Sequence, residues 1–323
     1  MALPVDGIAA PVEGIDEPAL ARVFAAIVHA SRETSGHVRR GALLAAPDPG
    51  GVTNVHGEVV HRLDILATET FVAAFDASDA VAGLVCEELV EPKFFDVPAG
   101  QPSYLCVLDP IDGTSNADIA VTIGSIFGVF PTERGVELSG EQPFLRPGSG
   151  FAATGYAVYG SSTVLVLATP GLVQEFTLDE ASGQFQLTRD DIRIPEACPY
   201  YSVNQGYEDR WEPEVREAVR VARQGRSLRY IGSLVSDFHR DLLKGGVFLY
   251  PADTDHLNGK IRVLYEAAVF AYIVEQAGGA ASTGAGPVLD LVPDSVHQRT
   301  PLFIGNAMAV QEIDGALRAR TPA

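Results

Sequence analysis

The octapeptide DPIDGTSN, residues 109–116, places two carboxylates three residues apart directly after the apolar run YLCVLD at 104–109. That run is rich in aromatic and β-branched residues, which predicts a strand. Pro110 fixes one backbone torsion and removes a donor, and Gly113 allows the chain to turn sharply. Taken alone, the octapeptide is interpreted equally well as a turn whose aspartates cap exposed amides.

A second acidic pair, Glu87-Glu88, ends another apolar run, VAGLVC, and favours metal binding over a plain turn. Mg²⁺ takes hard oxygen ligands, and crowded like charges repel unless a cation neutralises them. Two ions about 4 Å apart could clamp a phosphoryl group and activate a water for in-line attack. The backbone N–H groups of Gly113, Thr114 and Ser115 could bind phosphate oxygens as an anion nest does.

Six further motifs follow along the chain: YGSSTVLVLA (159–168), SVNQGY (202–207), RYIGSLVSDFHR (229–240), GGVFLYPAD (245–253), GKIRVLYEAAVFAYIVEQAGG (259–279) and HQR (297–299). DPIDGTSN resembles the metal motif of the magnesium-dependent, lithium-sensitive sugar phosphatases. The six motifs narrow the resemblance to the class I fructose-1,6-bisphosphatases. It stays in register from about Asn54 to Gly305, so it covers both halves of the chain.

The fold class predicted is α/β (α+β). A length of 323 residues suggests two domains of about 150 residues, and mixed strands and helices favour a sandwich of two halves. A polar, proline-bearing stretch at 181–200 predicts the boundary between them. We expect an N-terminal domain, 1–190, with the metal motif and the region matching the family's AMP domain, and a sugar-bisphosphate-binding domain, 191–323. The resemblance implies a layered α-β-α-β-α arrangement, whereas the strand order cannot be predicted.

The apolar periodicity predicts individual elements. The first helix is expected from about Asp16, with Asp16 as its N-cap. The other expected helices are His61 to Phe75, Pro213 to Arg223, IGSLVSDFHRDLL (231–243), and 262–277 stopped by Gly278-Gly279. The expected strands are 104–109, 123–130, two within 155–169, and 245–250.

The amino-acid composition argues against several classes of binding partner. Acidic residues outnumber basic ones, 42 to 23, for a formal net charge of −19, which argues against a nucleic-acid or anionic-membrane binder. No apolar run approaches the ~20 residues of a membrane span, and the N-terminus lacks the basic region of a signal peptide. Cys86, Cys106 and Cys198 are odd in number and show no CxxC spacing, which predicts no disulfide framework. We therefore expect a cytoplasmic protein that acts on a small molecule.

The resemblance implies two to three Mg²⁺ ions per subunit, with Mn²⁺ able to substitute. Asp64, in HRLDIL, matches the carboxylate that works with Glu88 to accept a proton from the attacking water. Glu58, in VHGEVV, matches a mobile-loop position that would hold a third metal or order the loop on closing. The metal ligands implied are Glu58, Glu87, Glu88, Asp109, the backbone carbonyl of Ile111, Asp112 and Glu266.

The resemblance also implies the substrate contacts. Gly113, Thr114, Ser115 and Arg262 match contacts to the 1-phosphate, Lys260 contacts the sugar, and the distal 6-phosphate pocket matches Asn204, Tyr207, Arg229, Tyr230 and Tyr250. A phosphate held at its far end would leave only the other ester at the metals. Without the resemblance, the tyrosines would be half-buried packing residues, and Arg229 and Lys260 would be solvated charges. Glu266 would then lie on the polar face of a helix, and His239 and His297 would be structural.

The activity implied is hydrolysis of the 1-phosphate of D-fructose 1,6-bisphosphate to fructose 6-phosphate and phosphate, in gluconeogenesis or the Calvin cycle. Sedoheptulose-1,7-bisphosphatase activity, alone or alongside it, is the nearest alternative, and a metal-binding module with a decayed site is another. In the family, the residue matching Arg229 reaches into a neighbouring subunit's pocket. A homodimer would then be the minimum active unit and a dimer of dimers the expected assembly.

We predict weak or absent inhibition by AMP. Many class I members bind AMP at a segment resembling R-G-T-G-E-x-T, where this chain has EGIDEPALARVF at 13–24. The family's Lys-Tyr pair is Ser103-Tyr104 here, and its arginine after the 123–130 strand is Pro131, so two positive phosphate contacts are missing. Micromolar inhibition by AMP in a steady-state assay at physiological Mg²⁺ would contradict the prediction. Thiol regulation is not expected either, because no cysteine-bearing insertion is present.

Overall fold

The computed structural model describes residues 2–41, 62–133 and 138–319. The chain divides into two compact units: an N-terminal unit, residues 1–144 and 151–191, and a C-terminal unit, residues 145–150 and 192–323. Both units combine helices with β-sheet, which confirms the mixed α/β class predicted from the sequence.

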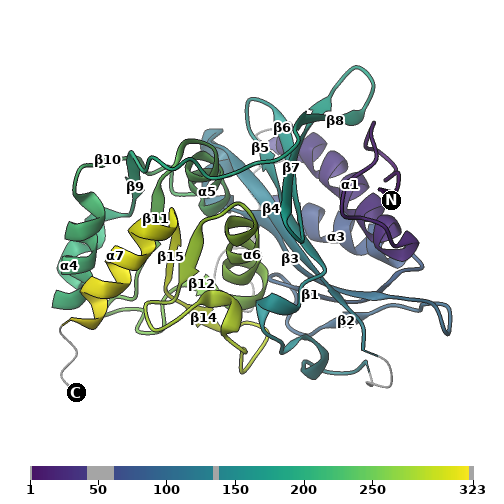
Figure 1. Ribbon diagram of the computed structural model, residues 1–323. Helices are drawn as coiled ribbons and strands as arrows, with labels where there is room; N and C mark the ends of the chain where they lie inside the picture. Colours follow the sequence, from purple (N-terminus) through teal and green to yellow (C-terminus); the bar gives the residue numbers. More distant parts are fainter. Residues whose placement is uncertain (1, 42–61, 134–137, 320–323) are drawn as a thin grey trace. The chain divides into compact units, whose positions relative to one another are not determined.

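An eight-stranded sheet, in the order β2-β1-β3-β4-β5-β6-β7-β8, forms the body of the N-terminal unit (Figure 1). Every neighbouring pair is antiparallel except β1 and β3, which run parallel. The strands are β1 (Val81–Cys86), β2 (Lys93–Phe94), β3 (Tyr104–Asp112), β4 (Ile123–Pro131), β5 (Ala153–Tyr159), β6 (Thr163–Thr169), β7 (Leu172–Asp179) and β8 (Gln184–Arg189). The strands expected at 104–109, 123–130 and within 155–169 are confirmed.

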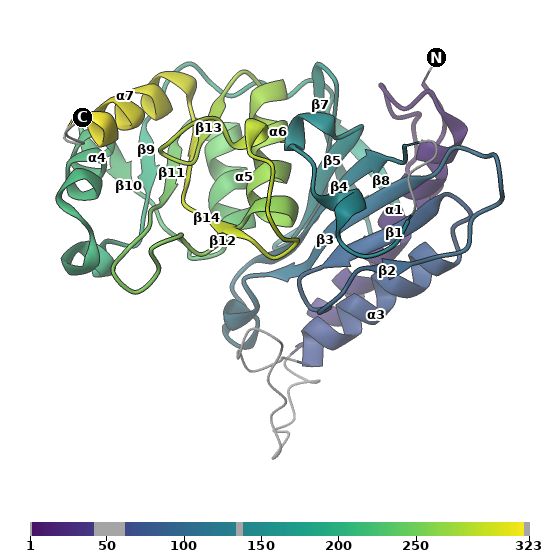
Figure 2. The ribbon, with the colours of Figure 1, turned by 90° about the horizontal axis from the view of Figure 1, so that it is seen from below.

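Two helices, α1 (Pro18–Val38) and α3 (Arg62–Asp76), lie side by side on one face of this sheet (Figures 1 and 2). Their apolar faces and the inward side chains of the sheet make one buried core. Within it, the rings of Phe24 and Phe127 meet edge to face, 6.5 Å apart between centroids. Both helices were expected from apolar residues at helical spacing, and both are confirmed.

The N-cap of α1 is Glu17, so the prediction of Asp16 is wrong. The Glu17 carboxylate accepts a hydrogen bond from the backbone N–H of Leu20 at 3.0 Å. The helix begins at Pro18, and the N-cap is by definition the residue directly before the first helical one. Asp16 therefore lies one residue outside the helix, although its side chain is the commoner cap.

In the C-terminal unit, a five-stranded sheet has the order β10-β9-β11-β15-β13, and β12 and β14 form a separate pair. Helices α4 and α7 cover one face of the five-stranded sheet, and α5 and α6 cover the other (Figure 2). The strands are β9 (Tyr200–Ser202), β10 (Ser227–Leu228), β11 (Val247–Tyr250), β12 (Ile261–Arg262), β13 (Ala280–Ser282), β14 (Arg299–Thr300) and β15 (Leu302–Gly305). The helices are α4 (Pro213–Arg223), α5 (Leu234–Lys244), α6 (Ala268–Gln276) and α7 (Ala307–Arg318).

The segment 262–277, expected to be one helix, consists of a short π-helical turn followed by a regular α-helix. Val263–Ala267 form a π-helical turn, η5, and only then does the regular helix α6 begin. It ends before Gly278-Gly279, as expected. The short 3₁₀ segments are η1 (Thr114–Ile119), η2 (Gln142–Phe144), η3 (Gly148–Gly150), η4 (Gln205–Arg210) and η6 (Val288–Asp290).

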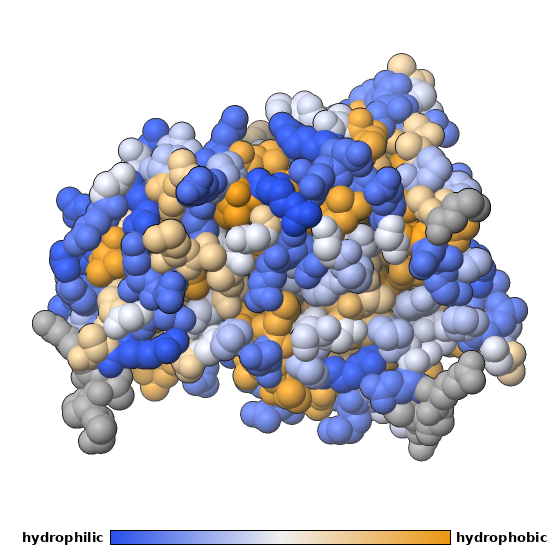
Figure 3. Space-filling view, viewed as in Figure 1, coloured by the Kyte–Doolittle hydropathy of each residue, from blue (hydrophilic) through white to orange (hydrophobic). Residues whose placement is uncertain are grey.

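Apolar residues on the surface are dispersed. In the view of Figure 3, hydrophobic residues are interspersed with hydrophilic ones. The large exposed apolar side chains come from separate elements, such as Ile65 in α3 and Met308 in α7. None of the helices in the described ranges is both long and apolar enough to cross a membrane.

Replacing Gly245 by alanine should destabilise the fold more than the same change at Gly278. Both glycines have positive φ, 77° and 88°, which costs an L-residue about 1–2 kcal/mol. A Cβ at Gly245 would also collide with the backbone carbonyl oxygen of Ala197, whereas Gly278 has open space around it. We expect Gly245→Ala to lower the free energy of unfolding by about 3 kcal/mol or more, measured by urea denaturation. Equal losses in the two variants would contradict this account.

Candidate functional site

The acids of the N-terminal unit gather at the carboxyl ends of two neighbouring parallel strands. Cys86, the last residue of β1, lies opposite Leu108 in β3, so Glu87 and Asp109 follow these paired positions at the same edge of the sheet. The backbone N–H of Glu87 donates to the carbonyl oxygen of Leu108 at 3.0 Å. The parallel register therefore brings the Glu87-Glu88 pair beside the start of DPIDGTSN. Both glutamates are half-buried.

A β-bulge in β3 turns Asp109 and Asp112 toward the same face. In a regular strand, residues three apart point to opposite faces. Here Asp109 pairs with Ile126 and Asp112 with Gly124, so three steps along β3 match two along β4. Ile126 and Gly124 are two residues apart in β4, so their positions lie on the same face of the sheet. The extra residue in β3 brings Asp109 and Asp112 onto that face as well. Their carboxylate oxygens lie within 4.8 Å of each other, and the residues are 2% and 8% exposed.

The turn after the bulge connects these acids to Asp64. Gly113 has a φ of 81°, which lets the chain reverse into η1. The Thr114 hydroxyl donates to Oδ1 of Asp64 at 2.7 Å and also lies 3.1 Å from the carbonyl oxygen of Ile111. Asp64 is buried in the first turn of α3. Asp64, which lies 45 residues before Asp109 in the sequence, is thus joined to the segment that carries Asp109 and Asp112 through one short turn.

The donor set fits a hard divalent cation. Burial raises the pKa of the Cys86 thiol, and the negative charges of Asp109, Glu88 and Glu87 raise it further. A cation is the usual means of keeping several carboxylates ionised in so negative and buried a place. Carboxylate and carbonyl oxygens are the ligands that Mg²⁺ and Mn²⁺ prefer. The residues present therefore fit the metal expected from the sequence.

In the C-terminal unit, Glu266 lies in the π-helical turn η5 and is 9% exposed, so it is not on the polar face of a helix. Its carboxylate accepts a hydrogen bond from the backbone N–H of Arg262 at 2.6 Å. Arg262 is buried as well and donates through its guanidinium to the carbonyl oxygen of His297 at 3.0 Å. The backbone of Arg262, the predicted phosphate contact, therefore orients the carboxylate of the predicted metal ligand Glu266.

Three residues predicted for the distal phosphate come together around one small pocket in the C-terminal unit. Asn204, Tyr207 and Tyr250 line it, with Val203, Trp211, Leu249 and Pro251. Burial raises the pKa of Tyr250 to about 12, with further contributions from Tyr207 and Glu266. Tyr250 therefore stays a neutral hydroxyl, able to donate a hydrogen bond, throughout the neutral pH range.

The other three residues predicted to contact substrate in this unit differ in exposure. Arg229 is exposed, and its backbone N–H donates to the carbonyl oxygen of Tyr201 at 2.9 Å, which continues the pairing of β10 with β9. Tyr230 and Lys260 are half-buried. All three predicted tyrosines are half-buried, which suits both a packing and a binding role. Glu58 lies outside the described residues.

Arg299 was not among the predicted site residues. It lies directly opposite Arg262 in the β12–β14 pair, and its Nε is buried without a hydrogen-bond partner in the part of the chain that the structure describes. Like charges opposite each other on a sheet are unfavourable unless an anion lies between them or near them. The motif HQR, which ends at Arg299, was the available sequence signal.

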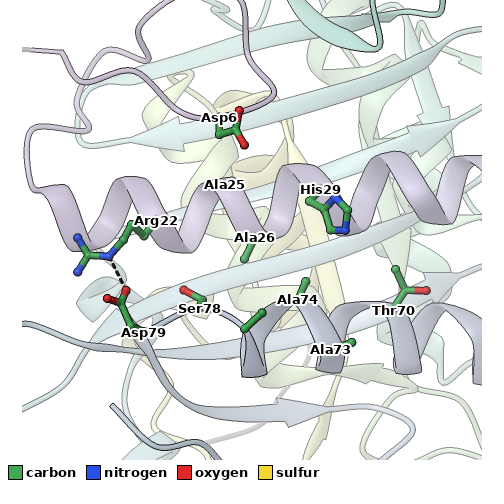
Figure 4. A pocket seen from close by; sticks show the side chains of 11 residues that line it. Asp6, Arg22, Ala25, Ala26, His29, Thr70, Ala73, Ala74, Ser78 and Asp79 are labelled. Carbon is green, nitrogen blue, oxygen red and sulfur yellow. Dashed lines mark hydrogen bonds and ion pairs between the residues drawn. The ribbon is translucent and has the colours of Figure 1, made fainter. Parts of the chain in front are cut away.

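A larger pocket of about 490 Å³ lies between α1 and α3 in the N-terminal unit (Figure 4). Ala26 and His29 of α1 point toward Ala74 of α3, and an ion pair of 2.6 Å joins Arg22 and Asp79 at one end. Among the residues that the structure describes, no predicted site residue lines this pocket. The acids of the candidate site therefore form a separate group.

Comparison with known proteins identifies the family. Residues 12–190 match the model of the fructose-1,6-bisphosphatase N-terminal domain, and residues 194–318 match that of the C-terminal domain. The chain is 44% identical over 300 residues to a cytosolic fructose-1,6-bisphosphatase of rice, Oryza sativa subsp. indica, covering 91% of this chain and 88% of that protein. It is 44% identical over 289 residues to a class 1 fructose-1,6-bisphosphatase of Sorangium cellulosum, covering 87% and 83%.

The crystal structure of Leishmania major fructose-1,6-bisphosphatase in holo form superposes with a TM-score of 0.87 at 35% identity, covering 94% of this chain and 96% of that one. The family predicted from the sequence motifs is thereby confirmed, and with it the fold. The chain belongs to the class 1 fructose-1,6-bisphosphatases, which are phosphoric monoester hydrolases.

Proposed function

We propose that this protein hydrolyses the 1-phosphate of D-fructose 1,6-bisphosphate and releases fructose 6-phosphate and inorganic phosphate. Membership of the family and the names of the relatives support this activity. The observation that carries it is the convergence of buried Asp109 and Asp112 immediately before the turn that begins at Gly113. That arrangement supports the proposal, because carboxylates able to hold a cation would then lie next to backbone N–H groups suited to phosphate.

Two to three Mg²⁺ ions, or Mn²⁺ in their place, belong to this proposal. The residues that would hold them are Glu87, Glu88, Asp109, the carbonyl of Ile111, Asp112 and Glu266, with Glu58 as a further ligand. Such ions neutralise charge on the phosphoryl group and make a bound water more acidic. The short contact between the Arg262 N–H and Glu266 would fix the direction in which that carboxylate points.

The protein's own groups would then move the proton and hold the ester. Asp64 and Glu88 would accept the proton of the attacking water, and the hydrogen bond from Thr114 would keep the Asp64 carboxylate oriented. The N–H groups of Gly113, Thr114 and Ser115, together with Arg262, would bind the 1-phosphate. Correct placement of a nucleophile and an ester can supply a large part of a rate enhancement.

The distal phosphate would fix the other end of the substrate. Asn204, Tyr207 and Tyr250 line one pocket in support of this, and Arg229, Tyr230 and Lys260 complete the proposed set. Arg229 is exposed, as is required of a residue that acts in a partner subunit, and we propose a homodimer as the minimum unit within a dimer of dimers. The compartment proposed is the cytoplasm, as for the relatives named cytosolic.

The experiment that tests the activity is phosphate release from a panel of sugar phosphates with and without Mg²⁺. We expect release from fructose 1,6-bisphosphate that stops when EDTA removes the metal. The alternative, sedoheptulose-1,7-bisphosphatase or dual activity, is tested by kcat/KM for the two sugars side by side. A higher kcat/KM for sedoheptulose 1,7-bisphosphate would overturn the fructose assignment. Absence of release from every sugar bisphosphate would indicate a decayed site.

Removing one proposed ligand or proton acceptor should abolish most of the activity. We expect Asp112→Asn and Glu88→Gln each to lower kcat by about 100-fold or more, because such groups stabilise charge or move protons in the transition state. Asp179→Asn is the matched control, since Asp179 caps an exposed turn in the same unit through Ala181 and Ser182. Near-normal turnover of Asp112→Asn and Glu88→Gln would show that the site assignment is wrong.

A further inference from the structure

We infer that Asp237 and Arg240 of α5 are positioning residues for the distal phosphate, an inference that rests on the role proposed above for Arg229 and Tyr230. Neither residue was predicted as part of the site. They build a charged cluster, together with Asp241 and Ser202, behind the two segments that supply the distal phosphate contacts. The cluster holds those segments in one relative arrangement.

Asp237 binds the backbone directly after Tyr230. Its carboxylate accepts hydrogen bonds from the N–H of Ile231 at 3.0 Å and from the N–H of Gly232 at 2.9 Å. The side chain is completely buried. Hydrogen bonds to an ionised acceptor are about twice as strong as neutral ones, so this carboxylate fixes the course of the chain that carries Arg229 and Tyr230.

Arg240 connects Asp237 to Ser202, the last residue of strand β9. Its guanidinium lies 2.8 Å from Oδ1 of Asp237 and 3.0 Å from Oδ1 of Asp241. It also donates to the hydroxyl of Ser202 at 2.5 Å and to the carbonyl oxygen of Arg229 at 3.4 Å. A planar guanidinium with five donors can make all of these contacts at once, which a lysine ammonium cannot.

Ser202 and Asp241 extend the cluster to the second segment. The Ser202 hydroxyl donates to Oδ2 of Asp241 at 3.1 Å, and Ser202 begins the motif SVNQGY that carries Asn204 and Tyr207. Burial raises the pKa of Asp241 to about 6, and the charge of Arg240 opposes that rise. One arginine therefore connects the chain at 202–207 with the chain at 229–232.

A purely structural role would have different consequences. Asp237 lies in the first turn of α5, where a negative charge stabilises a helix whatever the substrate does. Loss of that effect would lower the melting temperature but leave the affinity of the folded enzyme for phosphate unchanged. A positioning role requires that substrate affinity falls while the chemical step is kept, because the metal-site acids lie on other elements.

The test compares Asp237→Ala, Asp237→Asn and Arg240→Lys with the wild type in steady-state assays. Glu217→Gln is the matched control, since it removes a solvent-accessible ion pair, with Arg220, in helix α4 of the same unit. We expect KM for fructose 1,6-bisphosphate to rise about tenfold in Asp237→Ala and in Arg240→Lys, with kcat within about threefold of the wild type. Asp237→Asn, which keeps an acceptor for the two N–H groups, should show a smaller rise.

The inhibition constant of fructose 6-phosphate provides a second readout. This product keeps the distal phosphate and lacks the reacting one, so its inhibition constant should rise in the same ratio as KM. If Asp237→Ala does not fold, Asp237→Asn and Arg240→Lys carry the test. Unchanged KM and inhibition constants, or a fall in kcat alone, would overturn the inference, whatever the melting temperature.

Arg229→Ala and Tyr230→Phe separate this inference from the proposed function. If these two variants raise KM and the α5 variants do not, the positioning role fails while the distal phosphate pocket stands. If Arg229→Ala and Tyr230→Phe leave both constants unchanged, the proposed pocket itself fails and the inference fails with it. If all of these variants raise KM and the inhibition constant together, both are supported.

Discussion

Repulsion between ionised carboxylates held close together in a buried place is the constraint on which this molecule depends. Asp109 and Asp112 lie within 4.8 Å of each other, and Glu87 and Glu88 contribute to the same negative field, which reaches the thiol of Cys86. Such crowding opposes folding unless a cation is bound. A cation bound here would therefore stabilise the fold, since a ligand that binds only the folded state stabilises it by mass action.

The two units contribute different chemistry. The N-terminal unit supplies hard oxygen ligands and a turn whose N–H groups suit an anion, both placed by the β1–β3 register and by the bulge in β3. In the C-terminal unit, Asn204, Tyr207 and Tyr250 bring amide and hydroxyl groups around one pocket, and the carboxylate of Asp237 binds the backbone N–H groups of Ile231 and Gly232. Carboxylates suit a divalent cation, whereas hydroxyl and amide donors suit an anion such as phosphate, so the two units carry different kinds of binding group.

Local pattern was enough to predict the long central strands β3 to β6, strand β11 and five of the helices, because apolar runs and helical spacing are properties of neighbouring residues, whereas the other strands and α7 were not predicted. The long-range pairing was not predictable. That Cys86 lies opposite Leu108, and that β1 and β3 run parallel, depends on contacts across the sheet. Asp237 was missed for the same reason: in sequence it is one polar residue of an amphipathic helix, and only the fold shows its carboxylate against Ile231 and Gly232. The N-cap of α1 is Glu17 rather than the predicted Asp16, because the helix starts at Pro18.

The π-helical turn at Val263–Ala267 has a consequence for the spacing of residues along the chain. A π-turn contains roughly one residue more than an α-helical turn, which amounts to a single insertion between β12 and the regular helix α6. Removing one residue there would leave a regular helix but rotate everything before it by about 100° relative to α6. Glu266 could then no longer face the N–H of Arg262. The number of residues between the β12 strand and α6 is therefore as restricted as their identity.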